Sequence, residues 1–344
     1  MKIHKGVFMW ANNLRVFSAF AVVMLHVAAG FVGGIELSDL NYGNREWWAG
    51  NIYDSVTRWC VPLFVMISGY FLLNKDEPTS VFFKKRLNKI LIPLIFWSVF
   101  FSFWTVLKLT IKGELPSAPV VLAKAWVLGE PYFHLWYLFM IPFLYLVTPY
   151  LRMIFNRVSR NELLFLVCFS LSLSILNTLS SNILSYFEMS AKVTLFTNSF
   201  LMYIGYFCLG GYIAKYGVKQ RNSFAFVALV LAWSVTIVGS YFFTYKYFYS
   251  YLSINTVIAS VALFLLVQWN CDRDFNLSGI SKLSFGIYLV HPVFLDAVAF
   301  VGKDWLLSYM DVYLYIPLAS VIVFGFSYLS AFCMSKMPVL NKCV

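Results

Sequence analysis

The first long apolar segment contains two ionisable residues, Arg15 and His26, whose types and spacing could support chemistry. Eleven residues of an α-helix make three turns plus about 20°, so both side chains leave the same helix face, about 16 Å apart along the axis. Arginine is a permanent cation, whereas a neutral imidazole can accept a proton near pH 7. Two interpretations remain open: a functional pair, or an arginine that reaches the lipid headgroups beside a structural histidine.

Other ionisable groups also lie in or beside apolar segments. His291 precedes Pro292, whose missing N–H frees a carbonyl one turn earlier for a local polar group to satisfy. His134 opens another apolar segment among aromatic residues. Each histidine therefore has a structural alternative, at a proline kink or in an interfacial aromatic belt. Asp54 and Arg58 are four residues apart, which is more typical of an intrahelical ion pair than of a site.

The composition indicates the environment that surrounds these ionisable residues. Of 344 residues, 61% are apolar and only 12% are charged, with a mean hydropathy of +0.76. This excludes a disordered chain and an ordinary soluble enzyme, because too little polar surface is available to coat a particle in water. Six scattered cysteines without a CxxC motif predict small buried side chains, and neither a disulfide framework nor a zinc site.

We therefore predict an all-α fold, a polytopic transmembrane helical bundle of about ten spans that forms a single integral-membrane domain over residues 1–344. The fourth span contains Pro142 and Pro149 and could be kinked. The predicted spans are 7–34, 52–73, 89–111, 134–151, 163–185, 197–214, 223–244, 254–271, 283–302 and 312–335.

The distribution of basic residues predicts the orientation of the bundle. With both termini in the cytoplasm, the inner segments carry 17 lysines and arginines and the outer segments carry 6. The net charge of +11 thus points to topology and anionic lipid, with no nucleic acid as partner. Because Arg15 and His26 interrupt the first apolar stretch, we expect it to be a span and not a cleaved signal peptide.

Five short motifs follow one another along most of the chain. They are Arg15-x10-His26, the Pro-Leu-Phe-Val-Met-Ile-Ser-Gly-Tyr run at 62–70, the basic run at 82–93, His134-Leu135-Trp136, and the Tyr-Leu-Val-His-Pro run at 288–292. In this order they resemble the acyltransferase 3 family, ten-span bacterial membrane proteins that O-acylate surface polysaccharides and other acceptors. Within the family, the chain also resembles the acetyltransferases that modify enterobacterial common antigen.

Two positions depart from the family pattern. The basic pair of the family is often Arg-x-x-Arg, whereas this chain has Arg86 followed by Lys89, which keeps the charge but loses the bidentate fork. An acid often lies three residues before the first-helix arginine, whereas this chain has Asn12. The position of the presumed catalytic histidine is unchanged.

The resemblance implies an O-acetyltransferase of the bacterial cytoplasmic (inner) membrane. It would move an acetyl group from cytoplasmic acetyl-CoA to a hydroxyl of a lipid-linked sugar or surface polysaccharide, with His26 as general base and Arg15 in the catalytic site. Arg86 and Lys89 would bind the phosphates of the donor. Acetyl-CoA would be a co-substrate, and we expect neither a tightly bound cofactor nor a metal.

Several residues are candidates to bind substrate or to stabilise the oxyanion. They are Ser68, His134, Trp136, Tyr137, Tyr288 and His291. Ser68 has an alternative role, since the Ser68-Gly69 pair would also let two helices approach closely.

Two mechanistic and functional alternatives remain. The histidine could form a covalent acyl intermediate instead of acting as a base. The chain could also be a secondary transporter or polysaccharide exporter with Arg15 and His26 in a substrate or proton path. The absence of an internal repeat or of matched interrupted helices counts against transport.

Overall fold

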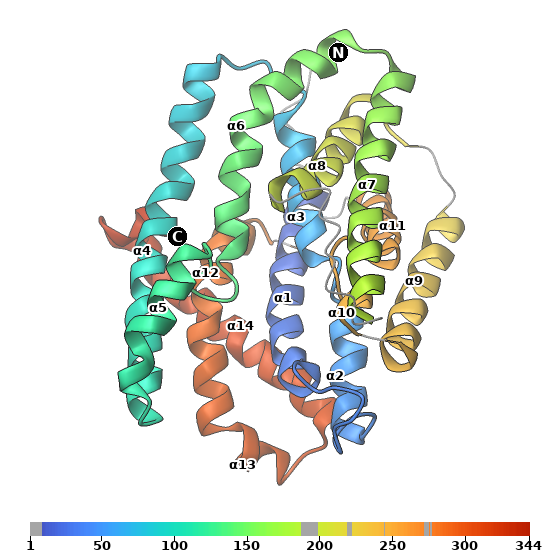
Figure 1. Cartoon of the computed structure of the whole chain (residues 1–344). Coiled ribbons are helices and arrows are strands. Elements are labelled where there is room, and N and C mark those ends of the chain that lie inside the picture. Colours follow the sequence, from blue (N-terminus) through green and yellow to red (C-terminus); the bar gives the residue numbers. More distant parts are fainter. Residues whose placement is uncertain (1–8, 187–198, 219–221, 244, 272–274, 276) are drawn as a thin grey trace. The chain divides into compact units, whose positions relative to one another are not determined.

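The computed structural model describes residues 9–186, 199–218, 222–243, 245–271, 275 and 277–344. Within these ranges all regular structure is helical, which confirms the all-α prediction (Figure 1). The chain forms two compact units. The first unit runs to Leu72 and resumes over Ser159–Ala331, and the second comprises Leu73–Val158 and Phe332–Val344.

The first unit contains most of the helices and is built around α1 (Met9–Val32). α1 packs against α2, α3, α11 and α12. Its later half joins a buried cluster in which Val27 and Phe31 of α1 meet Ala49 of α2 and Ile316 of α14. The other helices are α2 (Arg45–Ser55), α3 (Cys60–Leu72), α7 (Arg160–Tyr186), α8 (Ser199–Tyr216), α9 (Asn222–Phe242), α10 (Tyr245–Phe248), α11 (Ile254–Asn270), α12 (Ser278–Val301), α13 (Lys303–Leu307) and most of α14 (Val312–Lys336).

The second unit is organised around one long helix, α4 (Thr79–Ile111). α4 packs against α5 (Ala118–Val127) and α6 (Trp136–Arg157), with a short 3-10 helix, η1 (Leu115–Ser117), between α4 and α5. A second short 3-10 helix, η2 (Leu340–Lys342), lies near the C-terminus. The indole of Trp97 donates a hydrogen bond of 2.8 Å to the carbonyl of Cys343, which ties this terminal segment to α4.

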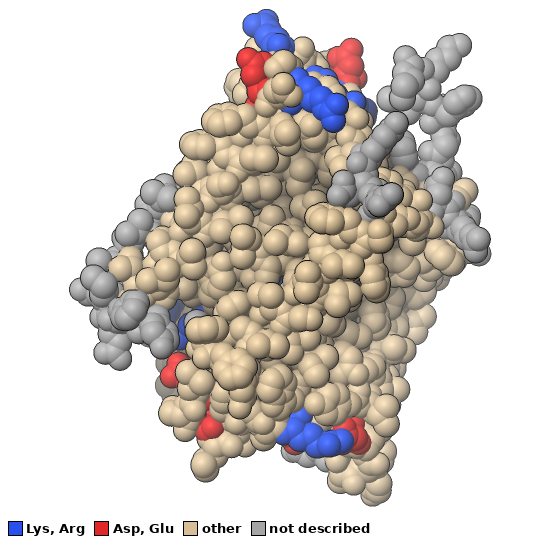
Figure 2. Space-filling view, turned by 90° about the vertical axis from the view of Figure 1, so that its right-hand side faces the viewer, with Lys and Arg blue, Asp and Glu red and all other residues tan. Residues whose placement is uncertain are grey.

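Eight helical segments among the described residues are long and apolar enough to cross a membrane. α11 has the apolar composition but is shorter, at 17 residues. Figure 2 shows a face whose middle is covered by uncharged residues, with charged side chains gathered mainly toward its ends. Exposed apolar residues such as Phe226, Leu231 and Val235 of α9 need lipid as their solvent. The chain is therefore a multi-pass membrane protein.

The predicted second span, 52–73, is interrupted. α2 and α3 are separated by a four-residue turn, 56–59, because Pro62 has no N–H and its ring would clash with the carbonyl of Arg58 in a continuous helix. The hydroxyl of Thr57 donates to the carbonyl of Asp54 at 2.9 Å, which satisfies a backbone group at the break. The interruption places Arg58 in a turn and not on a regular helix.

The third and fourth spans are longer than predicted. α4 begins at Thr79 and not at residue 89, so the basic run at 82–93 is helical, as expected where lysine and arginine allow a helix to continue. α6 runs through Pro142 and Pro149 without interruption and ends at Arg157. The predicted bounds are too short because they were placed where hydropathy falls, whereas a helix ends where its backbone hydrogen bonds end.

α3 and α8 approach closely through glycines. A Cβ on Gly69 would lie 1.8 Å from the carbonyl oxygen of Phe207, and a Cβ on Gly210 would lie 2.0 Å from the carbonyl oxygen of Met66. Neither position can therefore hold a larger residue without moving a backbone. The close helix approach predicted at Ser68-Gly69 is confirmed.

All six cysteines are free thiols: three are buried, two are exposed and Cys271 is half-buried. Cys60, Cys208 and Cys343 are buried, as predicted. Cys168 and Cys333 are exposed on α7 and α14, so the prediction of burial is wrong for them. Apolar helices of a membrane protein can direct a small apolar side chain to lipid as readily as to the core.

Candidate functional site

Two histidines from distant parts of the chain meet in the first unit. The ring of His26 on α1 stacks on the ring of His291 on α12, with centroids 5.2 Å apart and planes at 17°. His291 is fully buried, whereas His26 keeps part of its surface accessible. Because two stacked imidazolium ions would repel each other, at least one ring of the pair is neutral. His26 therefore points at another helix and not into lipid.

Pro292 explains the orientation of His291. The proline has no N–H to offer the carbonyl of Tyr288, one turn earlier. Nδ1 of His291 lies 2.7 Å from that carbonyl oxygen. Since a carbonyl only accepts, Nδ1 carries a proton, and in the neutral ring Nε2 then keeps its lone pair. The sequence-based expectation of a carbonyl satisfied by a local polar group is confirmed, and the ring of Tyr288 lies 6.1 Å from that of His291.

A buried ion pair lies at the break between α2 and α3. Arg58 forks onto Asp54, with Nε donating to Oδ1 and Nη2 donating to Oδ2 at 2.6 Å. The Asp54 side chain is fully buried and that of Arg58 is 15% exposed. The predicted i,i+4 ion pair is confirmed, but it is not intrahelical, because Arg58 lies in the turn after α2. Sequence reasoning treated it as separate from the site, yet the charge of Arg58 acts electrostatically on His26.

Two tyrosines complete the surroundings of Arg58. Its guanidinium carbon lies 4.4 Å from the ring centroid of Tyr249 and 5.9 Å from that of Tyr251. Nη1 also donates to the carbonyl of Tyr249 at 3.1 Å. Sequence analysis missed both residues, which lie between α10 and α11. The aromatic density of residues 241–251 was the one available signal, and it does not reveal a partner about 190 positions away.

Arg15 lies near the start of α1, away from the histidine pair. Its Nη1 donates to Oδ1 of Asn12 at 3.4 Å, and its guanidinium carbon lies 5.2 Å from the ring centroid of Phe71. The same Asn12 oxygen accepts from the hydroxyl of Ser281 at 3.0 Å. The amide oxygen of Asn12 thus accepts the hydrogen bond from Arg15 at the position where the family often has a carboxylate.

Ser68 lies on α3, and its hydroxyl donates to the carbonyl of Phe64 at 2.8 Å. This is a hydrogen bond within its own helix. Among the predicted site residues of the first unit, the structure therefore brings together His26, His291 and Tyr288, whereas Arg15 and Ser68 have separate surroundings.

The second unit contains the other aromatic candidates. His134 is buried in the turn before α6, with ring centroids 4.9 Å from Phe101 and 5.9 Å from Tyr132. Trp136 and Tyr137 are the first residues of α6 and are partly exposed. The rings around His134 fit the aromatic packing that the sequence left open as an alternative to a substrate role.

The predicted donor-binding residues lie on the first turns of α4. Arg86 is partly buried, and its Nε has no hydrogen-bond partner among the described residues. Lys89 is exposed. A buried guanidinium nitrogen of this kind favours an anionic ligand, since leaving it unsatisfied costs free energy.

The carboxylate of Glu77 organises three neighbouring cations, Lys75, Lys85 and Arg152. Glu77 accepts from Lys85 at 2.8 Å and from Lys75 at 3.4 Å, and the hydrogen bond from Lys85 holds the pKa of Glu77 below its usual value. Nη2 of Arg152 lies 4.0 Å from the same carboxylate, and its charge also acts on Arg86. This cluster carries a surplus of positive charge.

A pocket of about 210 Å³ opens within this cluster. Lys75, Glu77 and Arg152 contribute to its wall, together with Asn156 from the end of α6. Arg86 and Lys89 do not line it.

Residues 8–332 match the acyltransferase domain Acyl_transf_3. The chain belongs to the acyltransferase 3 family. The match covers nearly the whole chain, runs through both units and includes the stretches that contain His26, Arg58 and His291. The resemblance carried by the five motifs is thus confirmed at the level of the family.

The chain is also similar to proteins of Staphylococcus aureus. In strains MRSA252 and MSSA476 these are named probable poly-beta-1,6-N-acetyl-D-glucosamine export protein, and they are 24% identical over 254 residues, or 69% of each chain. No solved structure matches the chain.

Proposed function

We propose that this membrane protein is an O-acetyltransferase that moves an acetyl group from cytoplasmic acetyl-CoA to a hydroxyl of a lipid-linked sugar or surface polysaccharide. The observation that carries the proposal is the stacked His26–His291 pair; a buried Arg58–Asp54 ion pair in the same unit acts on it through the charge of Arg58. Ionisable groups are costly to place inside a bilayer, and residues of this kind mark functional sites there. We place the protein in the bacterial inner membrane, as a bundle of about ten spans with both termini in the cytoplasm.

In this proposal His26 acts as general base. An alcohol is almost fully protonated at pH 7, so its oxygen needs a base as it attacks the thioester carbonyl. His26 takes the hydroxyl proton, the new C–O ester bond forms, and the C–S bond breaks. The proton then passes from the imidazolium to the departing thiolate, giving the ester and the free thiol of coenzyme A.

His291 and Arg58 support this step. The hydrogen bond from His291 Nδ1 to the Tyr288 carbonyl fixes the ring against which His26 stacks. The positive charge of Arg58, held in place by Asp54, is available to the developing oxyanion. Of the residues proposed from the sequence as oxyanion donors, Tyr288 lies beside this pair, and Trp136 and Tyr137 remain proposals.

The donor would be held by the basic cluster around Arg86. Arg86 and Lys89 would contact the phosphates of acetyl-CoA, and the buried Nε of Arg86 supports the assignment of Arg86. Arg15 would guide the pantetheine arm or hold the start of α1 in register.

The test is acetyl transfer by the purified full-length protein in lipid nanodiscs. With acetyl-CoA and a lipid-linked oligosaccharide, release of free thiol should match the acetylated product seen by mass spectrometry. Thiol release or isotope exchange without any acceptor would instead support a covalent acetyl-histidine. No acetylated product with any acceptor would overturn the proposal.

Polysaccharide export is the second candidate, favoured by the names of the staphylococcal relatives. An exporter would move glycan into sealed, inverted vesicles without consuming acetyl-CoA. Mass spectrometry of surface glycans from cells with and without the protein separates the two: a transferase changes the acetyl content, whereas an exporter changes the amount at the surface. Poly-β-1,6-N-acetylglucosamine is the first glycan to examine.

A further inference from the structure

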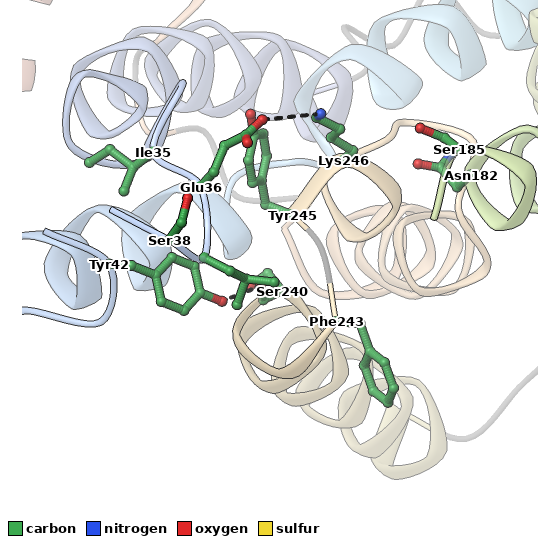
Figure 3. A pocket seen from close by; sticks show the side chains of 11 residues that line it. Ile35, Glu36, Ser38, Tyr42, Asn182, Ser185, Ser240, Phe243, Tyr245 and Lys246 are labelled. Carbon is green, nitrogen blue, oxygen red and sulfur yellow. Dashed lines mark hydrogen bonds and ion pairs between the residues drawn. The ribbon is translucent and has the colours of Figure 1, made fainter. Parts of the chain in front are cut away.

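A pocket of about 300 Å³ opens on the first unit, on the side that the charge distribution predicts to be external. Its wall is formed by the segment that follows α1, the last turns of α7, the end of α9, and α10 (Figure 3). The volume is at the lower end of the range of about 300–1,000 Å³ that small-molecule sites occupy. The pocket therefore has room for a short piece of a ligand.

The lining combines aromatic rings with short polar side chains. Tyr42 and Tyr245 contribute rings, and Asn182 and Ser185 contribute an amide and a hydroxyl from α7. Figure 3 shows Glu36 and Lys246 reaching toward each other over Tyr245, and their charged atoms are 3.6 Å apart. Rings that offer an apolar face beside polar groups suit a ligand that is itself apolar on one side and polar at its edges.

The ion pair in the pocket is available to a ligand. Both side chains are more than half exposed, so their mutual attraction is weak in water. Hydroxyl groups of a ligand can therefore bind Glu36 or Lys246 without a large cost in free energy from breaking the ion pair. A nucleotide would need several cations for its phosphates, whereas this pocket offers Lys246 opposed by Glu36. Nδ2 of Asn182 already donates to the carbonyl of Thr178 at 2.8 Å, but a lipid tail would offer no partner to the amide oxygen of Asn182 or to the hydroxyl of Ser185.

The pocket is linked to the histidine site by buried polar contacts. Ser240, in the pocket wall, donates to Oδ1 of Asn51 at 2.8 Å, and the hydroxyl of Tyr249 donates to the same oxygen at 2.7 Å. The Tyr249 ring packs on Arg58, whose charge acts on His26. His26 also lies only six residues, or about 9 Å, before the end of α1, from which the pocket segment continues.

We propose that this pocket binds a sugar ring of the glycan acceptor while another part of the glycan reaches His26. Sugar rings have C–H faces that pack on tyrosine and hydroxyl edges that pair with amide, hydroxyl and charged groups, and the pocket offers both. The inference rests on the proposed function for the role of this glycan as acceptor.

The inference is tested by the binding of cellotetraose and chitotetraose to the full-length protein in nanodiscs. Saturation-transfer NMR detects the binding, and titration of the protein with each oligosaccharide gives the dissociation constant. Tyr245→Ala should raise the dissociation constant roughly tenfold, because aromatic anchors dominate such contacts. Tyr247→Ala is the matched control: it removes the same side chain from the same helix, α10, outside the pocket, and should change affinity by less than about twofold. Asn182→Ala, on a different element, should also weaken binding.

The outcomes separate this inference from the proposed function. Binding that is lost in Tyr245→Ala but kept in Tyr247→Ala supports the pocket even if wild-type protein transfers no acetyl group, a result that overturns only the transferase. With transfer established, Tyr245→Ala should raise the KM for the acceptor and leave the KM for acetyl-CoA unchanged. No binding of either oligosaccharide, or equal losses in both tyrosine variants, would overturn the pocket assignment.

Discussion

At the scale of single residues, the site depends on a buried charge that is compensated by one partner. Replacing Arg58 with leucine leaves the carboxylate of Asp54 buried without its cation, since the two side chains are 15% and 0% exposed. We expect Arg58→Leu to lower the free energy of unfolding by about 3–5 kcal/mol. The double variant Asp54→Asn/Arg58→Leu should recover much of that loss. Thermal unfolding of the wild type, Arg58→Leu, Asp54→Asn and the double variant gives the coupling, and additive losses would contradict the pairing.

His291 has a structural task that can be separated from chemistry. His291→Ala leaves the Tyr288 carbonyl without the hydrogen bond that Pro292 makes necessary, which should cost about 1–3 kcal/mol of stability. His291→Gln keeps a side-chain N–H donor and should retain most of the stability. Both variants should lower kcat more than they raise KM, because both remove the ring on which His26 stacks. Unchanged kcat in both variants would assign His291 to structure alone.

At the scale of elements, the contact between α3 and α8 tests whether the helix packing is right. Gly69→Ala would place a Cβ 1.8 Å from a backbone oxygen, so the helices must separate and stability should fall clearly. Gly325→Ala on α14 is the control, since nothing lies within 4 Å of its Cβ and alanine favours a helix by about 1 kcal/mol. In thermal unfolding, Gly69→Ala should lower the stability and Gly325→Ala should raise it. Equal changes in stability in the two variants would contradict the packing of α3 against α8.

Elements were more predictable from the sequence than their interruptions. Hydropathy located the long apolar helices because lipid leaves helices as the practical spanning structure. The break between α2 and α3 was foreseeable from Pro62, but a hydropathy count passes over a single proline. The extension of α4 to Thr79 was missed because charged residues end a hydrophobic segment without ending a helix.

The candidate site was predictable only in part. Arg15 and His26 were visible because polar residues are conspicuous in an apolar helix, and Pro292 indicated the role of His291. Tyr249 and Tyr251 were not visible, since their contact with Arg58 joins segments far apart in the sequence. Packing between distant segments, and not local composition, brings these residues together.

At the scale of the whole molecule, the orientation in the membrane can be measured directly. In a background without the six native cysteines, Ser38→Cys should react with a membrane-impermeant thiol reagent added outside intact cells. Lys85→Cys should react only after the cells are opened, because the basic segments are predicted to be cytoplasmic. Both positions are exposed, so access to the reagent should depend on the side of the membrane alone. The reverse labelling pattern would contradict the orientation.

The central claim is that His26 performs the proton transfer, and the initial rate of acetyl transfer by His26→Ala tests it most directly. Wild-type protein and variant should be compared in nanodiscs with saturating acetyl-CoA and acceptor, after thermal unfolding has shown that both are folded. Loss of a general base predicts a decrease of about 10²–10⁴-fold in rate. A folded His26→Ala protein that transfers acetyl groups at close to the wild-type rate would contradict the account.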